Sequence, residues 1–268
     1  MKREREEVVS LPIDYQSKHT EDFNSACKTI LEIDPSLLDT IVSGDFPLFL
    51  KKEQELMTLN HHFTKLASSI LSQQISGSAA MSIKKKVTEL FAGSFPTYQD
   101  ISKLIANGDT AKLRSCGLSG RKVLYLESLA TYFNDNEDAI AVLLKQDDDE
   151  IIEALVKNVK GIGPWSAKMF LVTSLERMNV FAPEDLGVAR GCSRYLDSRP
   201  DVLKELLNKR VAIKRSKIKH KKSNWKIYDE DIVDKCGQLF APYRTVFMFI
   251  LWRLSSTDVD AMAKNSTS

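Results

Sequence analysis

The sequence predicts an all-α protein, and three observations carry that prediction. Apolar residues recur at the spacing of an α-helix, strict alternation with a period of two is nearly absent, and short polar turns interrupt the helical stretches. Because 43% of the 268 residues are hydrophobic, the chain can bury one large core or two smaller ones. We therefore expect short helices packed against one another and no large sheet.

The predicted elements follow in chain order. Residues 1–20 show no apolar periodicity, so we expect a mobile tail there. Turns rich in glycine, serine or asparagine at 93–96, 117–120 and 134–136 divide the middle of the chain. Two apolar stripes before these turns predict two helices, one with Phe63, Leu66, Ala67, Ile70, Leu71 and Ile75, the other with Met81, Ile83, Val87, Leu90 and Phe91.

Composition excludes several classes of protein. The longest apolar run near the C-terminus, Val246–Trp252, has seven residues, against about 20 for a membrane span. The N-terminus mixes basic and acidic residues and lacks the apolar stretch of a secretory signal. We therefore expect an intracellular protein without a disulfide framework or a zinc site. The cysteines, which are far apart and which we expect to be reduced and buried, are Cys27, Cys116, Cys192 and Cys236.

A tight hairpin between two helices is predicted around Gly161. The acidic cluster at 147–149 is a typical helix start, and the helix after it has a buried face formed by Ile151, Ile152, Leu155 and Val156. Gly161 and Gly163 then flank Ile162, which suits a sharp turn whose backbone approaches another group closely. Pro164 fits the first position of the following helix, where its missing N–H costs nothing.

Such a hairpin exposes backbone N–H groups at a helix N-terminus, where an anion can bind. We expect the backbone of Gly161, Ile162 and Gly163 to contact a DNA phosphate, with added contacts from Ser166 and Lys168. An ordinary αα-hairpin closed by glycines is the alternative that the Gly-x-Gly pattern alone leaves open.

Four motifs in order resemble the helix-hairpin-helix superfamily of base-excision DNA glycosylases. The first is the hairpin, which reads Leu155, then Val159-Lys160-Gly161-Ile162-Gly163-Pro164-Trp165-Ser166-Ala167. The second is Val180-Phe181-Ala182-Pro183-Glu184-Asp185, whose aspartate lies 22 residues after the second glycine. Two more are similar to alkylpurine glycosylases in particular: Ile70-Leu71-Ser72-Gln73-Gln74-Ile75-Ser76 with Ala79-Ala80, and Ala241-Pro242-Tyr243-Arg244-Thr245 with Leu251-Trp252-Arg253. The resemblance spans roughly residues 60–255.

This resemblance implies a two-lobed helical DNA glycosylase fold over residues 21–258, with a C-terminal tail at 259–268. A cleft between the lobes would be lined by Trp165, Asp185 and Trp252. The implied activity is monofunctional excision of alkylated purines, of the 3-methyladenine and 7-methylguanine type, by hydrolysis of the N-glycosidic bond after base flipping. The implied partner is double-stranded DNA with alkylated bases, and we expect a monomer without membrane contacts.

Asp185 is the predicted catalytic residue. Breaking a glycosidic bond passes through a transition state with oxocarbenium character. A fixed carboxylate stabilises that cation electrostatically and can orient or deprotonate the attacking water. Two alternatives stay open: Asp185 is only the N-cap of a helix over 186–195, or Glu184 is the catalytic acid.

The flipped base needs aromatic walls on which it can stack. Trp165 and Trp252 resemble the pocket tryptophans of the family, and plain core packing is the alternative for each. An alkylated purine such as 3-methyladenine carries positive charge, so electron-rich indole faces favour it through cation–π attraction. Such a base is already a good leaving group, so no general acid is needed to protonate it. This agrees with the sequence, in which only one carboxylate is a convincing catalytic candidate.

The resemblance also argues against a lyase step. Relatives that cleave the strand carry a lysine where this chain has Trp165, and neither Lys160 nor Lys168 falls at that position. The C-terminal part lacks the four-cysteine loop of an iron–sulfur cluster, so we expect no cofactor and no metal bound by side chains. Two rival functions remain: a bifunctional glycosylase and lyase on oxidised bases, and a non-catalytic DNA-binding module.

Further contacts are predicted by resemblance. Side chains must fill the stack that a flipped base vacates, and candidates for DNA contact in two loops are Gln73, Gln74, Arg121 and Lys122. Both loops could equally be helix caps and solvated turns. A monovalent cation that bridges the hairpin to a phosphate could be held by the backbone carbonyls of Lys157, Val159 and Ile162.

One segment has a strong local charge. Residues 209–222 hold eight Lys or Arg residues and no acid, so the net charge of +2 becomes 2 − 8 = −6 without them. Nucleic-acid affinity must then come from local patches. We expect this basic insertion in a loop after the Asp185 helix, where it could contact DNA phosphates, act as a nuclear-import signal, or be a solvated insertion. In a nucleus-bearing organism we expect the protein in the nucleus, otherwise in the cytoplasm.

Overall fold

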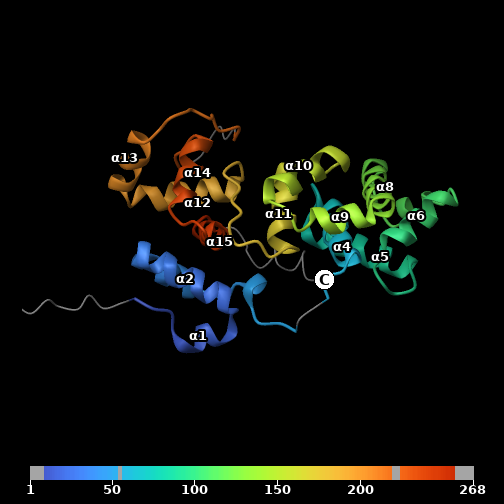
Figure 1. The fold of residues 1–268 in the computed structure, drawn as a ribbon, viewed down its shortest axis with the longest axis horizontal. Helices are drawn as coiled ribbons and strands as arrows, with labels where there is room; N and C mark the ends of the chain where they lie inside the picture. The colour runs from blue at the N-terminus through green and yellow to red at the C-terminus, as the bar shows by residue number, and fades with distance from the viewer. Residues whose placement is uncertain (1–8, 54–55, 219–223, 257–268) are drawn as a thin grey trace, which may run out of the picture. The chain divides into compact units, whose positions relative to one another are not determined.

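The computed structural model describes residues 9–53, 56–218 and 224–256, and within these ranges the regular structure is helical (Figure 1). No strand forms in them, and only one isolated antiparallel bridge joins His19 and Leu50. The prediction of an all-α fold is therefore confirmed. None of the helices in these ranges is both long enough and apolar enough to cross a bilayer.

The chain forms two compact units. The middle unit covers residues 56–177, with the helices α4 (Leu59–Ser72), α5 (Gly77–Leu90), α6 (Tyr98–Ala106), α7 (Ala111–Ser115), α8 (Gly120–Asp135), α9 (Glu137–Leu143), α10 (Asp148–Asn158) and α11 (Pro164–Thr173). The terminal unit joins residues 9–53 to 178–256, with α1 (Ile13–Lys18), α2 (Glu21–Ile33), α3 (Leu38–Val42), α12 (Leu186–Asp197), α13 (Pro200–Asn208), α14 (Glu230–Gln238) and α15 (Arg244–Leu254). Two 3-10 turns, Pro35–Leu37 and Pro47–Phe49, flank α3.

The core of the middle unit lies between α4, α6 and α8. Phe63 of α4 meets Tyr98 of α6 and Phe133 of α8, with ring centroids 5.9 and 5.7 Å away. The first predicted stripe lies on α4 and is buried, apart from Ile75, which lies beyond the helix end and is 39% exposed. The second stripe lies on α5, but its Met81 is 57% exposed because α5 packs mainly against α4.

Local signals in the sequence set the helix boundaries of this unit. The predicted turn at 93–96 lies between α5 and α6, and the turns at 117–120 and 134–136 coincide with the start and the end of α8, so all three mark helix boundaries. Each of α4, α5, α6 and α8 begins after a Ser or Thr whose hydroxyl accepts a backbone N–H, and these N-caps are Thr58, Ser76, Thr97 and Ser119.

The terminal unit is organised around the pair α12 and α15. The two backbones approach so closely at Gly191 that a Cβ built there would lie 2.0 Å from the carbonyl oxygen of Leu251. Only glycine permits such an approach. On the same side of α15, Phe247 stacks on Phe240 at 3.7 Å between centroids and helps to fill the core.

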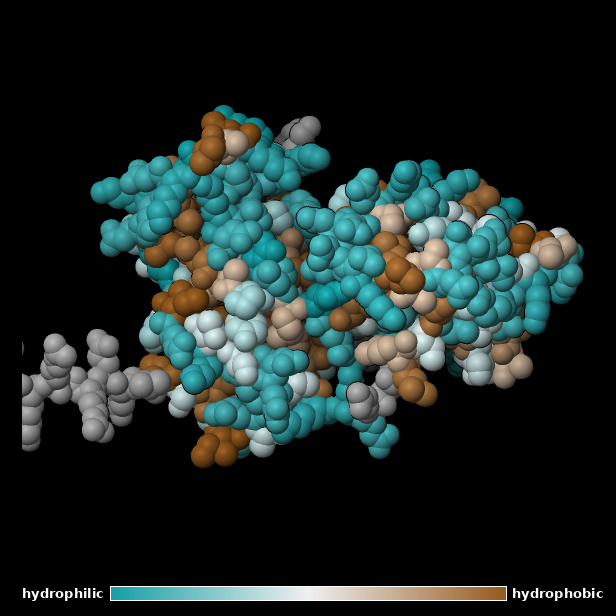
Figure 2. Space-filling view, viewed as in Figure 1, coloured by the Kyte–Doolittle hydropathy of each residue, from teal (hydrophilic) through white to brown (hydrophobic). Residues whose placement is uncertain are grey.

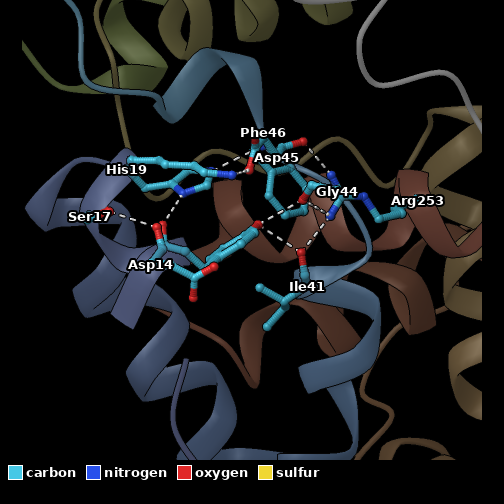
Figure 3. A network of polar contacts seen from close by, with 10 residues as sticks. Asp14, Ser17, His19, Ile41, Gly44, Asp45, Phe46 and Arg253 are labelled. Atoms are coloured by element: carbon cyan, nitrogen blue, oxygen red, sulfur yellow. Dashed lines mark hydrogen bonds and ion pairs between the residues drawn. The ribbon is translucent and has the colours of Figure 1, made fainter. Parts of the chain in front are cut away.

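The predicted N-terminal tail is wrong over residues 9–20, whereas residues 1–8 lie outside the described residues. Residues 13–18 form α1, and the Tyr15 hydroxyl donates to the carbonyl oxygens of Ile41 and Gly44, both labelled in Figure 3, at 2.8 and 3.0 Å. His19 is fully buried, with Nδ1 at 2.9 Å from the Tyr15 carbonyl and Nε2 accepting from the amide of Phe46. These long-range contacts leave no periodic signal in so short a helix, so the pattern missed them.

The described part of the basic insertion, residues 209–218, is largely exposed, and ion pairs connect it to the first turn of α14. It follows α13, one helix later than expected. Arg210 bridges Asp231 at 2.7 Å and Asp229 at 2.6 Å, and Lys214 contacts Glu230 at 2.8 Å. Most of these residues are nevertheless exposed to solvent, among them Val211 at 94%. The solvated, DNA-contact and nuclear-import alternatives therefore all stay open. Residues 219–222 lie outside the described residues.

Polar side chains cover most of the visible face of each unit, with hydrophobic residues in scattered groups (Figure 2). Most of the large apolar residues are instead buried, although Ile75, Met81 and Leu90 of the two predicted stripes are exposed at 39, 57 and 37%. All four cysteines are buried with free thiols, which confirms that prediction.

Candidate active site

The loop that leads to Asp185 is fixed by the start of α15. The guanidinium of Arg244 donates to the side-chain and backbone oxygens of Asn179, both at 2.7 Å. The hydroxyl of Thr245 accepts the backbone N–H of Val180 at 2.9 Å, and this bond is buried. Two residues of the motif at 241–245 thus hold the chain where the motif at 180–185 begins.

Asp185 is the N-cap of α12, as one of the two alternatives predicted. Its Oδ1 accepts the backbone N–H of Val188 at 2.9 Å, which satisfies one of the open donors at the helix start. The same oxygen also accepts the indole N–H of Trp252 at 2.8 Å. A cap needs only the first bond, so the second, from a helix that begins 59 residues after Asp185, shows that more than capping fixes this carboxylate.

Trp252 is buried on α15, with 1% of its surface exposed. Its ring meets Phe249 at 4.8 Å between centroids in an edge-to-face arrangement. The predicted role as a wall of a base pocket stays a prediction, and the structure adds a hydrogen bond to the candidate catalytic residue that the sequence could not reveal.

Glu184, the alternative catalytic acid, is half-buried and lies in a charged neighbourhood. The hydrogen bond that the Lys214 ammonium donates to Glu230 raises the pKa of Lys214, and the negative charge of Glu184 contributes in the same direction. Glu184 therefore has a basic group of the basic insertion near it, while Asp185 has two neutral N–H donors. The structure gives these adjacent carboxylates different surroundings.

The hairpin joins α10 to α11 as predicted, with Pro164 at the first position of α11. Gly161 has a positive φ of 84°, and a Cβ built on it would lie 2.2 Å from the ring of Tyr125. Its carbonyl accepts from the Gln73 amide at 2.9 Å. The Gly-x-Gly pattern is thus required by a left-handed turn packed tightly against α8, and Tyr125 is a contributor that sequence reasoning missed.

The start of α11 has the features of an anion site. Its N-cap is Gly163, which has no side chain to accept the first backbone N–H groups. Trp165 on the first turn is 38% exposed, whereas Ser166 is 8% exposed and Lys168 is half-buried. The phosphate contacts predicted for Ser166 and Lys168 stay predictions, as does the cation on the carbonyls of Lys157, Val159 and Ile162.

The two candidate loops for stack filling are in part helix caps, as the alternative held. Gln73 ends α4 and is bound to Gly161, and the Lys122 ammonium donates to the carbonyl of Leu71 at 2.6 Å. Gln74 differs, because it is exposed and has φ of 58°, a conformation that non-glycine residues rarely adopt. Arg121 is exposed at the start of α8.

Metal binding has no support from side chains. Among the described residues, no group of three or more His, Cys, Asp or Glu side chains could hold a metal ion. The terminal unit contains a fixed carboxylate, and the middle unit contains a glycine hairpin followed by a partly exposed indole. The proposed sharing of one cleft by Trp165, Asp185 and Trp252 stays a prediction.

Known proteins with similar sequences and structures agree on one family. Residues 67–213, more than half of the chain, match the model of the HhH-GPD superfamily of base excision DNA repair proteins. The chain is 56% identical over 259 residues to the DNA-3-methyladenine glycosylase of Saccharomyces cerevisiae, covering 96% of this chain and 88% of that protein. It is 28% identical over 201 residues to DNA-3-methyladenine glycosylase 1 of Schizosaccharomyces pombe, covering 72% of each.

Two solved structures resemble the fold. The DNA-3-methyladenine glycosidase of Bacillus halodurans superposes with a TM-score of 0.61 at 26% identity, covering 87% of this chain and 89% of that one. The Schizosaccharomyces pombe 3-methyladenine DNA glycosylase in complex with abasic DNA gives a TM-score of 0.59 at 24% identity, covering 88% and 98%.

Proposed function

The chain belongs to the HhH-GPD superfamily of base excision DNA repair proteins, and from this we propose that it excises alkylated purines from double-stranded DNA as a monofunctional glycosylase with Asp185 as its catalytic carboxylate. The proposal has one main structural support. Oδ1 of Asp185 is held by the amide of Val188 and by the indole of Trp252, at 2.9 and 2.8 Å. A carboxylate fixed by donors from two helices is preorganised for electrostatic work.

Hydrolysis of the N-glycosidic bond is favoured by such a carboxylate. Departure of the base leaves positive charge on the deoxyribose, and a nearby fixed negative charge stabilises it without reorganisation. The carboxylate can also orient the attacking water or accept its proton. A cationic base such as 3-methyladenine leaves readily, so no second acid is required to protonate it.

The base specificity is proposed to come from the indole ring of Trp165. Trp165 offers a partly exposed aromatic face on the first turn of α11. A cationic purine binds such a face more strongly than a neutral one, by roughly 0.5–2 kcal/mol. Because Trp165 stands where strand-cleaving relatives have a lysine, no Schiff base with the sugar is expected, and borohydride should trap no covalent adduct.

We expect DNA to bind at the hairpin between α10 and α11 and at the turn after α4. No side chain caps the start of α11, and a helix N-terminus favours a phosphate electrostatically. Gln74 is the better candidate to fill the vacated stack, because Gln73 is already bound to Gly161 while Gln74 is exposed. Since its substrate is genomic DNA, the protein would act in the nucleus of a nucleus-bearing organism.

The decisive test is release of free 3-methyladenine from methylated duplex by wild type and Asp185→Asn. Asparagine is also a good N-cap, so α12 should survive. We expect excision to fall about 100-fold or more while DNA binding persists. Asp197→Asn, an exposed aspartate at the other end of α12, is the matched control and should excise normally.

The same assay separates the alternatives. Glu184→Gln should keep most activity, and if it rather than Asp185→Asn abolishes excision, the catalytic assignment moves to Glu184. Wild-type protein that binds methylated DNA but releases no base would support the non-catalytic alternative instead.

A further inference from the structure

We propose that Trp252 is a positioning residue for the catalytic carboxylate, and that Arg253 anchors it to the N-terminal segment. This inference rests on the proposed function and deepens it. The sequence pointed to Trp252 as a stacking wall, whereas the structure gives its indole N–H a defined partner, Oδ1 of Asp185 at 2.8 Å. This hydrogen bond would orient the carboxylate of Asp185 for catalysis.

The bond determines how the carboxylate is oriented. The amide of Val188 holds Oδ1 of Asp185 at a single point on α12, and one such bond does not by itself prevent rotation of a carboxylate about it. A second donor from another helix restricts that rotation, so both oxygens have defined directions. Hydrogen bonds to a charged group are about twice as strong as neutral ones, which makes this restraint effective.

Trp252 is itself held rigidly. It is 1% exposed and lies edge-to-face against Phe249. The residue before it, Leu251, touches α12 at Gly191, where the two backbones are in direct contact. The indole therefore cannot turn away from Asp185 without moving α15.

Arg253 continues this chain of contacts to the segment between α3 and the turn at 47–49 (Figure 3). Its guanidinium lies 3.6 Å from the ring centroid of Phe46. It donates to four backbone carbonyls, of Thr40, Ile41, Gly44 and Asp45, at 3.2, 2.7, 3.0 and 2.7 Å. The N-terminal segment thus fixes the end of α15 that carries Trp252.

These parts lie outside the residues that match the family model, 67–213. Trp252, Arg253 and the segment at 40–46 would therefore contribute to catalysis from beyond the matched region. Their contribution acts through Asp185 and requires no contact with DNA.

The test replaces the indole N–H while it keeps the ring. The isosteric analogue β-(3-benzothienyl)alanine, incorporated at position 252, has sulfur in place of the N–H. We expect the single-turnover rate of 3-methyladenine release to fall about 10- to 100-fold, the loss expected for a hydrogen bond to a charged group. Affinity for an abasic duplex should change less than about twofold, because no DNA contact is removed.

Two further variants separate positioning from stability. Phe247→Leu removes buried aromatic volume from the same helix, and we expect lower stability with an unchanged rate. In the Asp185→Asn background, the analogue should have no additional effect, because the bond then serves no catalytic charge. Arg253→Lys should lower the rate about tenfold, with DNA affinity preserved.

The outcomes distinguish this inference from the proposed function. If Asp185→Asn excises normally, the proposed function fails. If Asp185→Asn is inactive but the analogue at position 252 releases base at the wild-type rate, only the positioning role of Trp252 is overturned. A rate loss of equal size in both backgrounds would also overturn it, since the effect would then not pass through Asp185.

Discussion

Gly191→Ala is expected to push α12 and α15 apart and thereby to misplace Asp185. The added Cβ would lie 2.0 Å from the carbonyl oxygen of Leu251, and the other two contacts under 3 Å are also backbone atoms of that residue. Ordinary contact begins near 3.4 Å, so the helices must separate by 3.4 − 2.0 = 1.4 Å. No flexible side chain can absorb this movement.

The magnitude follows from that distance. Overpacking in a core costs about 1–3 kcal/mol, and a backbone contact on both sides places this case near 3 kcal/mol. Alanine regains up to about 1 kcal/mol of helix propensity, so the free energy of unfolding should fall by about 2 kcal/mol. If the shift reaches the indole, the distance from Trp252 to Asp185 grows from 2.8 to 2.8 + 1.4 = 4.2 Å, which breaks the hydrogen bond.

Two measurements check this prediction. Urea unfolding followed by circular dichroism gives the stability loss, and single-turnover release of 3-methyladenine should slow at least about tenfold in the folded variant. Gly120→Ala is the control, because a Cβ at Gly120 meets nothing within 4 Å. A Gly191→Ala protein with the stability and excision rate of wild type would refute the close contact between α12 and α15.

Two other variants probe the middle unit. In urea titrations, Gly161→Ala should lower the free energy of unfolding by about 2 kcal/mol, because residue 161 has φ of 84° and its Cβ would clash with Tyr125. Gly163→Ala, where a Cβ meets nothing within 4 Å, should change this free energy by less than about 0.5 kcal/mol. Burial, and secondarily the charge of His61, lowers the pKa of His62 to about 4. As the pH falls, His62 of the unfolded chain therefore binds a proton near pH 6.5, whereas His62 of the folded protein stays neutral until about pH 4. The free energy of unfolding should consequently fall between pH 6.5 and pH 4, by on the order of 3 kcal/mol from this group. His62→Gln should have a correspondingly shallower acid slope in unfolding titrations, and an unchanged slope would contradict the assignment.

Much of the fold was predictable because its signals are local. Helix starts at Pro164 and after Asp185, and the turns between the middle helices, depend on residues within a few positions of the boundary. The exposure of Met81 was not predictable, because a stripe does not reveal how much of it a neighbouring helix covers. Likewise α1 has only six residues and owes its place to partners more than 25 positions away, such as Ile41.

The candidate site was predictable in its residue types but not in its internal contacts. Asp185 follows from the motif, yet its bond to Trp252 joins positions 67 apart, a pairing that one sequence cannot show. The DNA contact predicted for Lys122 shows a second way in which one sequence limits prediction. A lysine in a loop suggests phosphate, but this ammonium donates to the end of α4, and burial lowers its pKa.

The contacts made by the short motifs near the C-terminus could not be predicted from their positions in the sequence. Arg244 and Thr245 hold the loop before Asp185, Trp252 holds its carboxylate, and Arg253 holds Trp252 in place from the other side. All four residues therefore contact the loop before Asp185, its carboxylate, or the segment beside the end of α15. It follows that substitutions there should slow base release by more than their effect on unfolding explains, whereas substitutions elsewhere in the core of the terminal unit should lower stability and leave the rate of base release by the folded protein unchanged.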